Sequence, residues 1–142
     1  EVLKHVVSTS AKIKVEVVEK DEKESDLRRI LNFGHTIGHA IERDKKILHG
    51  QAVSLGMLMA ARLSRNLGLL GDAEVDQLRE LLRAAGLPVE MELDPEKIYQ
   101  NMRKDKKKSG EQIHFVLLEG LGKTQIRSIS LSELKVMIHD LC

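Results

Sequence analysis

The chain has 142 residues, of which 42% are hydrophobic and 32% charged, with a formal net charge of +1. This length allows one domain with a real core, and the near-neutral charge excludes a global field for nucleic acid or an anionic membrane. The sequence contains no signal peptide and no bilayer-spanning apolar run, and the single cysteine, Cys142, excludes an internal disulfide, so we expect a cytoplasmic protein.

The first half of the chain predicts helices. Apolar residues from Val2 to Val18 recur at helical spacing, although residues 13–17 also alternate as in a strand. Ser25 has the chemistry of an N-cap and predicts a helix that runs to about Arg43. A strongly apolar helix follows over residues 52–67, closed by Gly68. Because position 1 is Glu, we expect a segment of a longer chain.

The second half predicts further helices and one hairpin. Each helix begins at a residue with capping chemistry, namely Asp72, Asp94 followed by Pro95, and Ser130, which forms a capping box with Glu133. Residues 113–118 and 123–129 predict two short strands around a Gly-containing turn. With only 2% aromatic residues, the core must be aliphatic, as in packed helices. We therefore expect a mainly α, multi-helix single domain over residues 1–142 with one small β-hairpin.

The segment from residue 28 to residue 40 is the most informative. Four-residue spacing places His35 and His39 on one helical face, with Gly34 and Gly38 beside them. Each helical glycine costs about 1 kcal/mol relative to alanine, which a sequence accepts where a backbone or ligand comes close. On the expected helix, the same stripe continues toward the N-terminus through Asn32 and Arg28. This pattern suits a metal and an anionic, hydroxylated ligand.

Other interpretations of this segment remain open. Histidines four apart are often incidental, and paired glycines can form a helix-packing groove. His49 at the start of the next helix favours the metal site, because a third imidazole can reach the same place. The metalloprotease motif is not met, since Thr36 stands where its glutamate belongs. The basic run over residues 103–108 suits a surface loop or a phosphate clamp.

Residues 28–42 and 48–57 together resemble the core signature of the 3-dehydroquinate synthases. The first stretch reads Arg-x-x-Leu-Asn-Phe-Gly-His-Thr-x-Gly-His-Ala-Ile-Glu, and the second Leu-His-Gly-x-Ala-Val-x-x-Gly-Met. Residues 14–24, 85–88 and 105–107 also match. The sequence departs from the family at Gln51, where glutamate is usual, and in a shorter segment between Glu42 and His49.

The resemblance implies a function. Family members convert 3-deoxy-D-arabino-heptulosonate 7-phosphate to 3-dehydroquinate in the shikimate pathway of aromatic amino acid biosynthesis, with NAD and a divalent metal, zinc or cobalt. They are lyases and tend to form homodimers. The NAD-binding N-terminal domain is absent from this chain, so we expect the isolated segment to be inactive. Related cyclases, such as 2-deoxy-scyllo-inosose synthase, share the signature and remain an alternative, as does a non-catalytic helical interaction module.

The resemblance also implies roles for individual residues. His35 and His49 would be metal ligands, the third ligand being a glutamate in the family's N-terminal half. The catalytic set would comprise His39, Lys14 and Glu24. The substrate, a phosphorylated sugar acid, would be bound by Arg28, Asn32, His39, Lys106 and Lys107. From the residues alone, without the family resemblance, we would interpret Lys14, Glu24 and the lysine run as solvated surface residues. His5 belongs to no recognisable motif.

Overall fold

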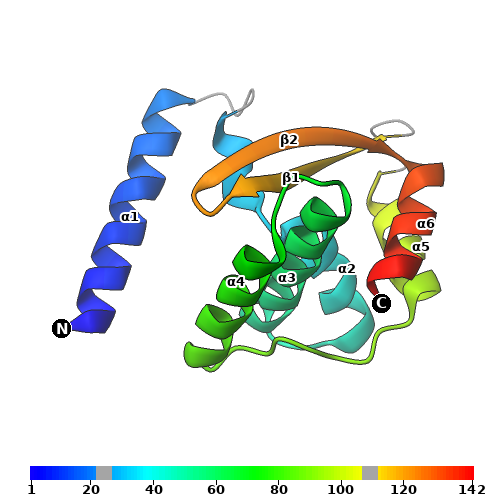
Figure 1. Cartoon of the computed structure of the whole chain (residues 1–142), viewed down its shortest axis with the longest axis horizontal. Coiled ribbons are helices and arrows are strands. Elements are labelled where there is room, and N and C mark those ends of the chain that lie inside the picture. Colours follow the sequence, from blue (N-terminus) through cyan, green and yellow to red (C-terminus); the bar gives the residue numbers. More distant parts are fainter. Residues whose placement is uncertain (22–26, 107–111) are drawn as a thin grey trace.

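The computed structural model describes residues 1–21, 27–106 and 112–142, without the side chains of residues 105 and 106. Its elements follow one another as a series of helices interrupted by a hairpin (Figure 1). They are α1 (Val2–Lys20), η1 (Leu27–Asn32), α2 (His35–Lys45), α3 (His49–Asn66), α4 (Asp72–Ala84), α5 (Pro95–Lys106), β1 (Gln112–Gly120), β2 (Lys123–Ser130) and α6 (Leu131–Leu141). The mainly α fold with one small hairpin is confirmed.

The core forms around α3, ten of whose residues are buried. Helix α2 packs along α3, and α5, α6 and β1 close the same core. Its fully buried side chains are aliphatic apart from Phe115, and they include Ile37, Ile41, Leu63, Ile98, Leu117, Leu134 and Ile138. A second cluster lies between α3 and α4 and includes Leu58, Val75, Leu78 and Leu82. The aliphatic core expected from the composition is therefore present.

The hairpin is tied to α3 by a buried serine. Strands β1 and β2 pair antiparallel, with Ile113 opposite Ile129. The hydroxyl of Ser64 donates to the carbonyl oxygen of Ala60 at 2.8 Å and accepts from the backbone N–H of Leu118 at 2.9 Å. Since a buried N–H without a partner is destabilising, Ser64 helps to fix β1 on the helical layer.

Two of the three helix caps expected in the second half of the chain are found. The carboxylate of Asp94 accepts from the backbone N–H groups of Glu96 and Lys97, and Ser130 forms its capping box with Glu133. Asp72 is not the cap of its helix, because Gly71 occupies the N-cap position and Glu74 accepts from its N–H. The predicted cap is one residue too late, because glycine is also favoured at the N-cap and the prediction considered only a side-chain cap.

The expected single helix from residue 25 to about Arg43 is wrong over the described residues. The chain forms the 3-10 helix η1, turns at Phe33–Gly34, and starts α2 at His35. Gly34 has a φ of 79°, in the left-handed region, so it separates the two elements. Arg28 and Asn32 are therefore on a different element from His35 and His39, and not on the same helical stripe. Ser25 lies outside the described residues.

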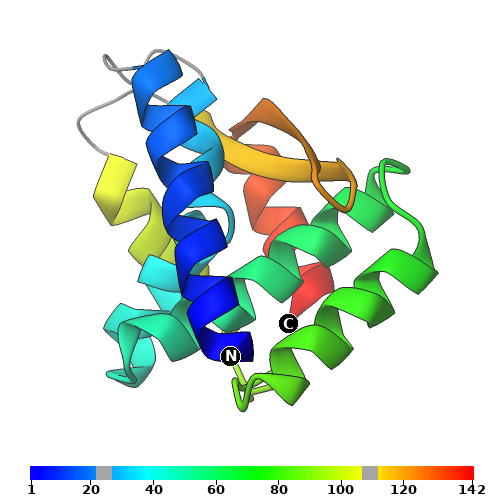
Figure 2. The same cartoon turned by 90° about the vertical axis from the view of Figure 1, so that its left-hand side faces the viewer.

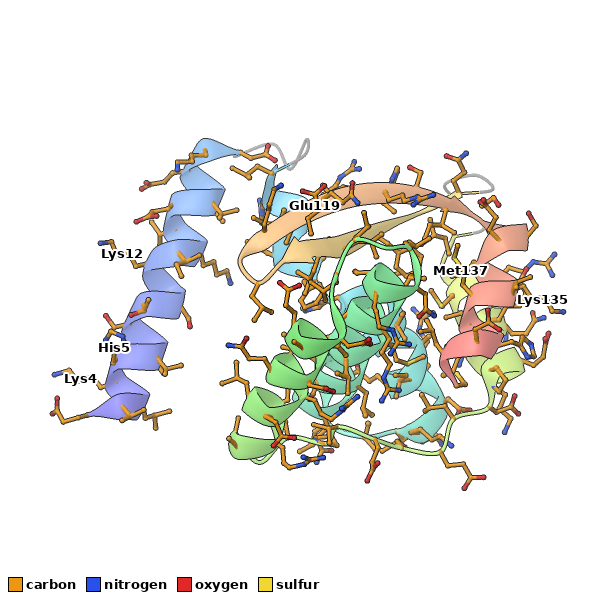
Figure 3. All side chains as sticks on the ribbon, in the orientation of Figure 1. Lys4, His5, Lys12, Glu119, Lys135 and Met137 are labelled. Carbon is orange, nitrogen blue, oxygen red and sulfur yellow. The ribbon has the colours of Figure 1, made fainter. Side chains whose placement is uncertain are left out.

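Helix α1 lies at one side of the molecule and packs through its C-terminal end against η1 (Figures 1 and 2). Val17 is its buried residue, whereas Val2 and Leu3 are 79% and 76% exposed. The labelled side chains of Lys4, His5 and Lys12 point away from the other elements (Figure 3). The residues 13–17 that alternate like a strand are helical. Within the described residues, no helix is long and apolar enough to cross a membrane.

Candidate metal centre

Three histidine rings lie together where α2 meets α3. His35 is the first residue of α2, His39 follows one turn later, and His49 is the first residue of α3. The ring centroids are 5.6 Å apart for His35 and His39, 5.4 Å for His35 and His49, and 5.7 Å for His39 and His49. Residues 14 positions apart in sequence, His35 and His49, thus face one another across the helix junction.

Glycines bring the two helices close enough for this arrangement. A Cβ atom on Gly38 would lie 3.1 Å from the carbonyl oxygen of Ala52, and one on Gly34 would lie 2.6 Å from the backbone nitrogen of Met57. On α3, Gly56 approaches both Gly34 and Gly38. The expected glycine groove is therefore real, and α3 of the same chain fills it. The histidines project from a junction in which backbone packs directly on backbone.

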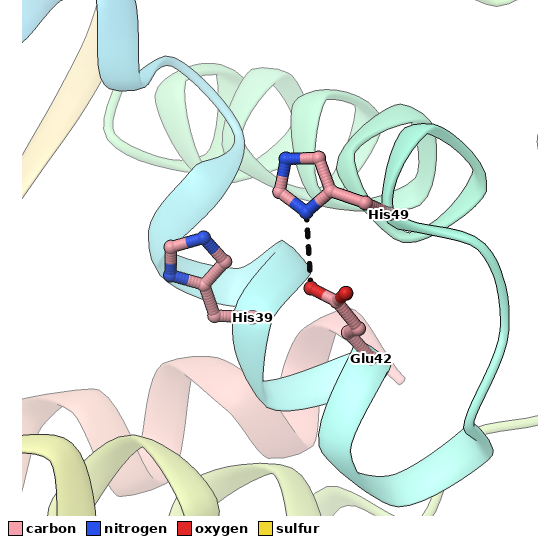
Figure 4. Close-up of side chains that lie close together, drawn as sticks. All are labelled: His39, Glu42 and His49. Atoms are coloured by element: carbon pink, nitrogen blue, oxygen red, sulfur yellow. Dashed lines mark hydrogen bonds and ion pairs between the residues drawn. The ribbon is translucent and has the colours of Figure 1, made fainter.

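A carboxylate joins the histidines. Oε2 of Glu42 lies 3.0 Å from Nδ1 of His49 (Figure 4). One donor atom from each of His39, Glu42 and His49 lies within 4.8 Å of the others, a spacing that allows a shared cation. The hydrogen bond from His49, with smaller contributions from the charges of His49, His39 and Arg43, lowers the pKa of the Glu42 carboxyl. Glu42 is therefore ionised at neutral pH.

Glu42 is not among the site residues predicted from the sequence. The available signal was its position three residues after His39, which puts both side chains on one side of α2. Its partner His49 lies on the next helix, so the contact itself depends on how α2 and α3 pack.

His35 and His49 each have an oxygen partner at Nδ1 that sets the tautomer of the ring. Carbonyl and ionised carboxylate oxygens only accept hydrogen bonds, so a ring nitrogen facing one carries the proton. Nδ1 of His35 lies 3.2 Å from the carbonyl oxygen of Phe33, and Nδ1 of His49 faces Glu42. In the neutral ring, Nε2 is then the nitrogen with a free lone pair, which is the form that binds a metal. Imidazole nitrogens with a carboxylate suit zinc or cobalt.

The other predicted site residues are spread over several elements. Asn32 lies exposed at the end of η1 and Arg28 is half-buried near its start, where its backbone N–H donates to Asp21. Lys14 is exposed on α1. Lys106 ends α5, but its side chain is not described, and Glu24 and Lys107 lie outside the described residues. The structure thus brings together the histidines and Glu42.

Comparison with known proteins identifies a family. Residues 1–108 match the family described as 3-dehydroquinate synthase C-terminal. The chain is 43% identical over 140 residues to the 3-dehydroquinate synthase of Thermoanaerobacter pseudethanolicus, and 47% identical over 124 residues to that of Streptomyces coelicolor. These alignments cover 95% and 85% of this chain but only 39% and 34% of the relatives. The chain therefore spans less than two fifths of their length.

Solved structures show the same fold. A crystal structure of 2-deoxy-scyllo-inosose synthase, complexed with carbaglucose-6-phosphate, NAD+ and Co2+, superposes with a TM-score of 0.73 at 27% identity. It covers 89% of this chain, which matches 38% of that one. The 2-epi-5-epi-valiolone synthase of Streptomyces hygroscopicus gives a TM-score of 0.79 over 96% of this chain and 39% of that one, and at 24% identity it supports the fold alone. On these findings, the chain belongs to the 3-dehydroquinate synthase C-terminal family.

Proposed function

We propose that this chain is the metal- and substrate-binding part of a 3-dehydroquinate synthase, which converts 3-deoxy-D-arabino-heptulosonate 7-phosphate to 3-dehydroquinate and phosphate. The observation that carries the proposal is the convergence of His35, His39 and His49 at one helix junction. The relatives that bear this name are 43% and 47% identical to the chain. Catalysis would need the part of the relatives that this chain does not span, so the chain by itself is expected to be inactive.

His35 and His49 are the proposed metal ligands. Each has its Nδ1 engaged, by Phe33 and Glu42 respectively, which leaves Nε2 as the coordinating atom. A third ligand, a glutamate from outside this chain, would complete a site with two histidines, one carboxylate and an open position. Zinc or cobalt held there supplies Lewis acidity toward the substrate's hydroxyl groups.

His39 is proposed to act on the substrate. Its ring lies 5.6 Å from that of His35 and 5.7 Å from that of His49, so it faces the same region without being needed as a ligand. A partly exposed imidazole there is suited to accept or donate a proton at a substrate oxygen. Bidentate binding of an anionic group suits the guanidinium of Arg28, with an amide contribution from Asn32.

Family resemblance supplies the remaining proposed residues. Lys14 on α1, Glu24, Lys106 and Lys107 are assigned to the catalytic and substrate-binding sets by family resemblance. Lysine presents a compact charge with three donors and suits a phosphate group. NAD is proposed as the second cofactor, held mainly by the N-terminal domain that completes the enzyme. A cytoplasmic location and a homodimer are also proposed. The neighbour 2-deoxy-scyllo-inosose synthase was crystallised with NAD+ and Co2+.

A related sugar-phosphate cyclase is the second candidate. The structural match to 2-deoxy-scyllo-inosose synthase favours it, although that protein shares only 27% identity with the chain. The departures at Gln51 and between Glu42 and His49 also fit a related substrate. The third reading, a non-catalytic interaction module, loses its main support because Gly34 and Gly38 pack within the chain.

A chimeric enzyme tests the function. The corresponding part of the Thermoanaerobacter pseudethanolicus synthase is replaced by this chain, and phosphate release from 3-deoxy-D-arabino-heptulosonate 7-phosphate is measured with NAD and cobalt. We expect release that is abolished by His35→Ala and retained with His5→Ala. Release from glucose 6-phosphate instead would favour the second candidate. A folded chimera that binds NAD but releases no phosphate from either sugar would contradict the proposal.

A further inference from the structure

We propose that Glu42 is a positioning residue, which fixes the tautomer and orientation of His49 so that His49 binds the metal through Nε2. This inference rests on the proposed metal site and adds to it a residue that makes the site competent. Its basis is the contact of 3.0 Å between Oε2 of Glu42 and Nδ1 of His49 (Figure 4).

The contact is built by the junction between α2 and α3. Glu42 lies in the last part of α2 and His49 is the first residue of α3, and residues 46–48 connect the two helices. The start of α3 is fixed locally, because the side-chain oxygen of Gln51 accepts from the backbone N–H of Leu48 at 3.3 Å. The glycine packing of Gly38 against Ala52 sets the separation of the helices. The packing of α2 on α3 therefore holds the Glu42 carboxylate in place beside the His49 imidazole.

The contact with Glu42 decides which nitrogen of the neutral His49 ring carries the proton. One ring nitrogen carries a proton and the other a lone pair, and only the latter can bind a metal. In water the neutral ring favours the proton on Nε2, which would block that atom. A carboxylate beside Nδ1 favours the opposite tautomer and also orients the ring, as carboxylates behind metal-binding histidines commonly do. His35 receives the equivalent support from a backbone carbonyl.

Exposure limits the size of the effect. The side chains of His49 and Glu42 are 53% and 37% exposed, so water competes for both partners. Loss of a residue that orients a metal ligand typically weakens metal binding by about 10- to 100-fold. We expect Glu42→Ala to lie near the lower end, about tenfold. Glu42→Gln should fall between wild type and Glu42→Ala, because the amide oxygen still accepts a hydrogen bond but carries no charge.

The tautomer is read directly by long-range 1H–15N NMR on the 142-residue chain labelled with [15N]histidine. In the metal-free wild type at a pH where His49 is neutral, we expect its proton on Nδ1. Glu42→Ala should shift the proton toward Nε2. The matched control is Glu80→Gln, which removes an exposed carboxylate on α4 that pairs with Arg83, and it should leave His49 unchanged. Circular dichroism confirms that each variant is folded.

Cobalt titration of the same proteins completes the experiment. The expected result is weaker binding in Glu42→Ala with coordination of His49 through Nε2 in the wild type. A proton on Nε2 in the wild type, a tautomer unaffected by Glu42→Ala, or coordination through Nδ1 with Glu42 as a direct ligand would overturn the inference. If the tautomer shifts as expected but cobalt does not bind to His49 at all, the proposed function fails while the positioning of His49 by Glu42 stands.

Discussion

A Cβ atom on Gly56 would lie 2.1 Å from the carbonyl oxygen of Gly34. It would also lie 2.7 Å from the backbone nitrogen of Gly38, so backbone atoms on two sides exclude any side chain. The approach of α2 to α3 at this point determines how far His35 and His39 lie from His49. The stability of the domain and the distances between the histidines thus depend on the same packing contact, the one at Gly56.

Gly56→Ala should destabilise the domain by about 3 kcal/mol, the upper part of the range for overpacking, because backbone cannot move aside as a flexible side chain would. The measurement is the free energy of unfolding in urea. Gly50→Ala is the matched control, since Gly50 is also on α3 and its added Cβ would meet nothing within 4 Å. That control should be stabilising by up to about 1 kcal/mol. Equal effects of the two substitutions would contradict the role given to Gly56.

Ser64→Ala should lower the free energy of unfolding by about 1–3 kcal/mol, because it leaves the buried N–H of Leu118 without its acceptor. The hydroxyl of Ser64 bridges α3 and β1, so the loss should also increase hydrogen exchange at Leu118. The control is Ser10→Ala on the exposed part of α1, which should change stability by no more than a few tenths of a kcal/mol. An unchanged exchange rate at Leu118 would show that another group supports β1.

Acid should remove part of the stability of α6. Hydrogen bonds from the side chain and then the backbone of Ser130 lower the pKa of the Glu133 carboxyl below its ordinary value of 4.5. A carboxyl group with a lower pKa in the folded state binds fewer protons there, so it stabilises the fold above pH 4.5. This contribution is lost as the pH falls through the lower, folded-state pKa.

Thermal unfolding between neutral pH and about pH 3 measures this contribution. Glu133→Gln should melt below the wild type at neutral pH, and the two curves should converge in acid. The control, Glu92→Gln, changes an exposed residue in the segment between α4 and α5 and should follow the wild type throughout. A difference for Glu133→Gln that persists at the acid end would mean that packing, and not the charge, is responsible.

Local chemistry made much of the fold predictable. Asp94 and Ser130 mark helix starts by satisfying backbone N–H groups within a few residues, and that information lies entirely in the local sequence. The break at Gly34 could not be read in the same way, because it depends on Gly56, a residue 22 positions later. Helical spacing alone continued through the break, and it therefore placed Arg28 and Asn32 on the wrong element.

Part of the site was also predictable from local sequence, and part was not. His35 and His39 lie together because of their spacing on one helix, and His49 was predicted to lie near them because it begins the next helix. The contact between Glu42 and His49 depends on the relative placement of α2 and α3, which no spacing rule supplies. The exposure of Val2 and Leu3 on α1 could not be predicted from the sequence either, since an apolar stripe predicts a buried helix face.

His35 and His49 are proposed to bind one metal ion between them, and cobalt binding to the chain shows whether they do. The visible absorption of bound Co2+ is titrated for the wild type, His35→Ala, His49→Ala and His5→Ala, where His5 is exposed on α1. Binding should be weak in the wild type and unchanged in His5→Ala. In the first two variants the loss of a direct ligand should weaken it by more than the roughly 10- to 100-fold that is typical for loss of a residue behind a ligand. If all three substitutions leave the titration as it is in the wild type, the two rings do not form a metal site.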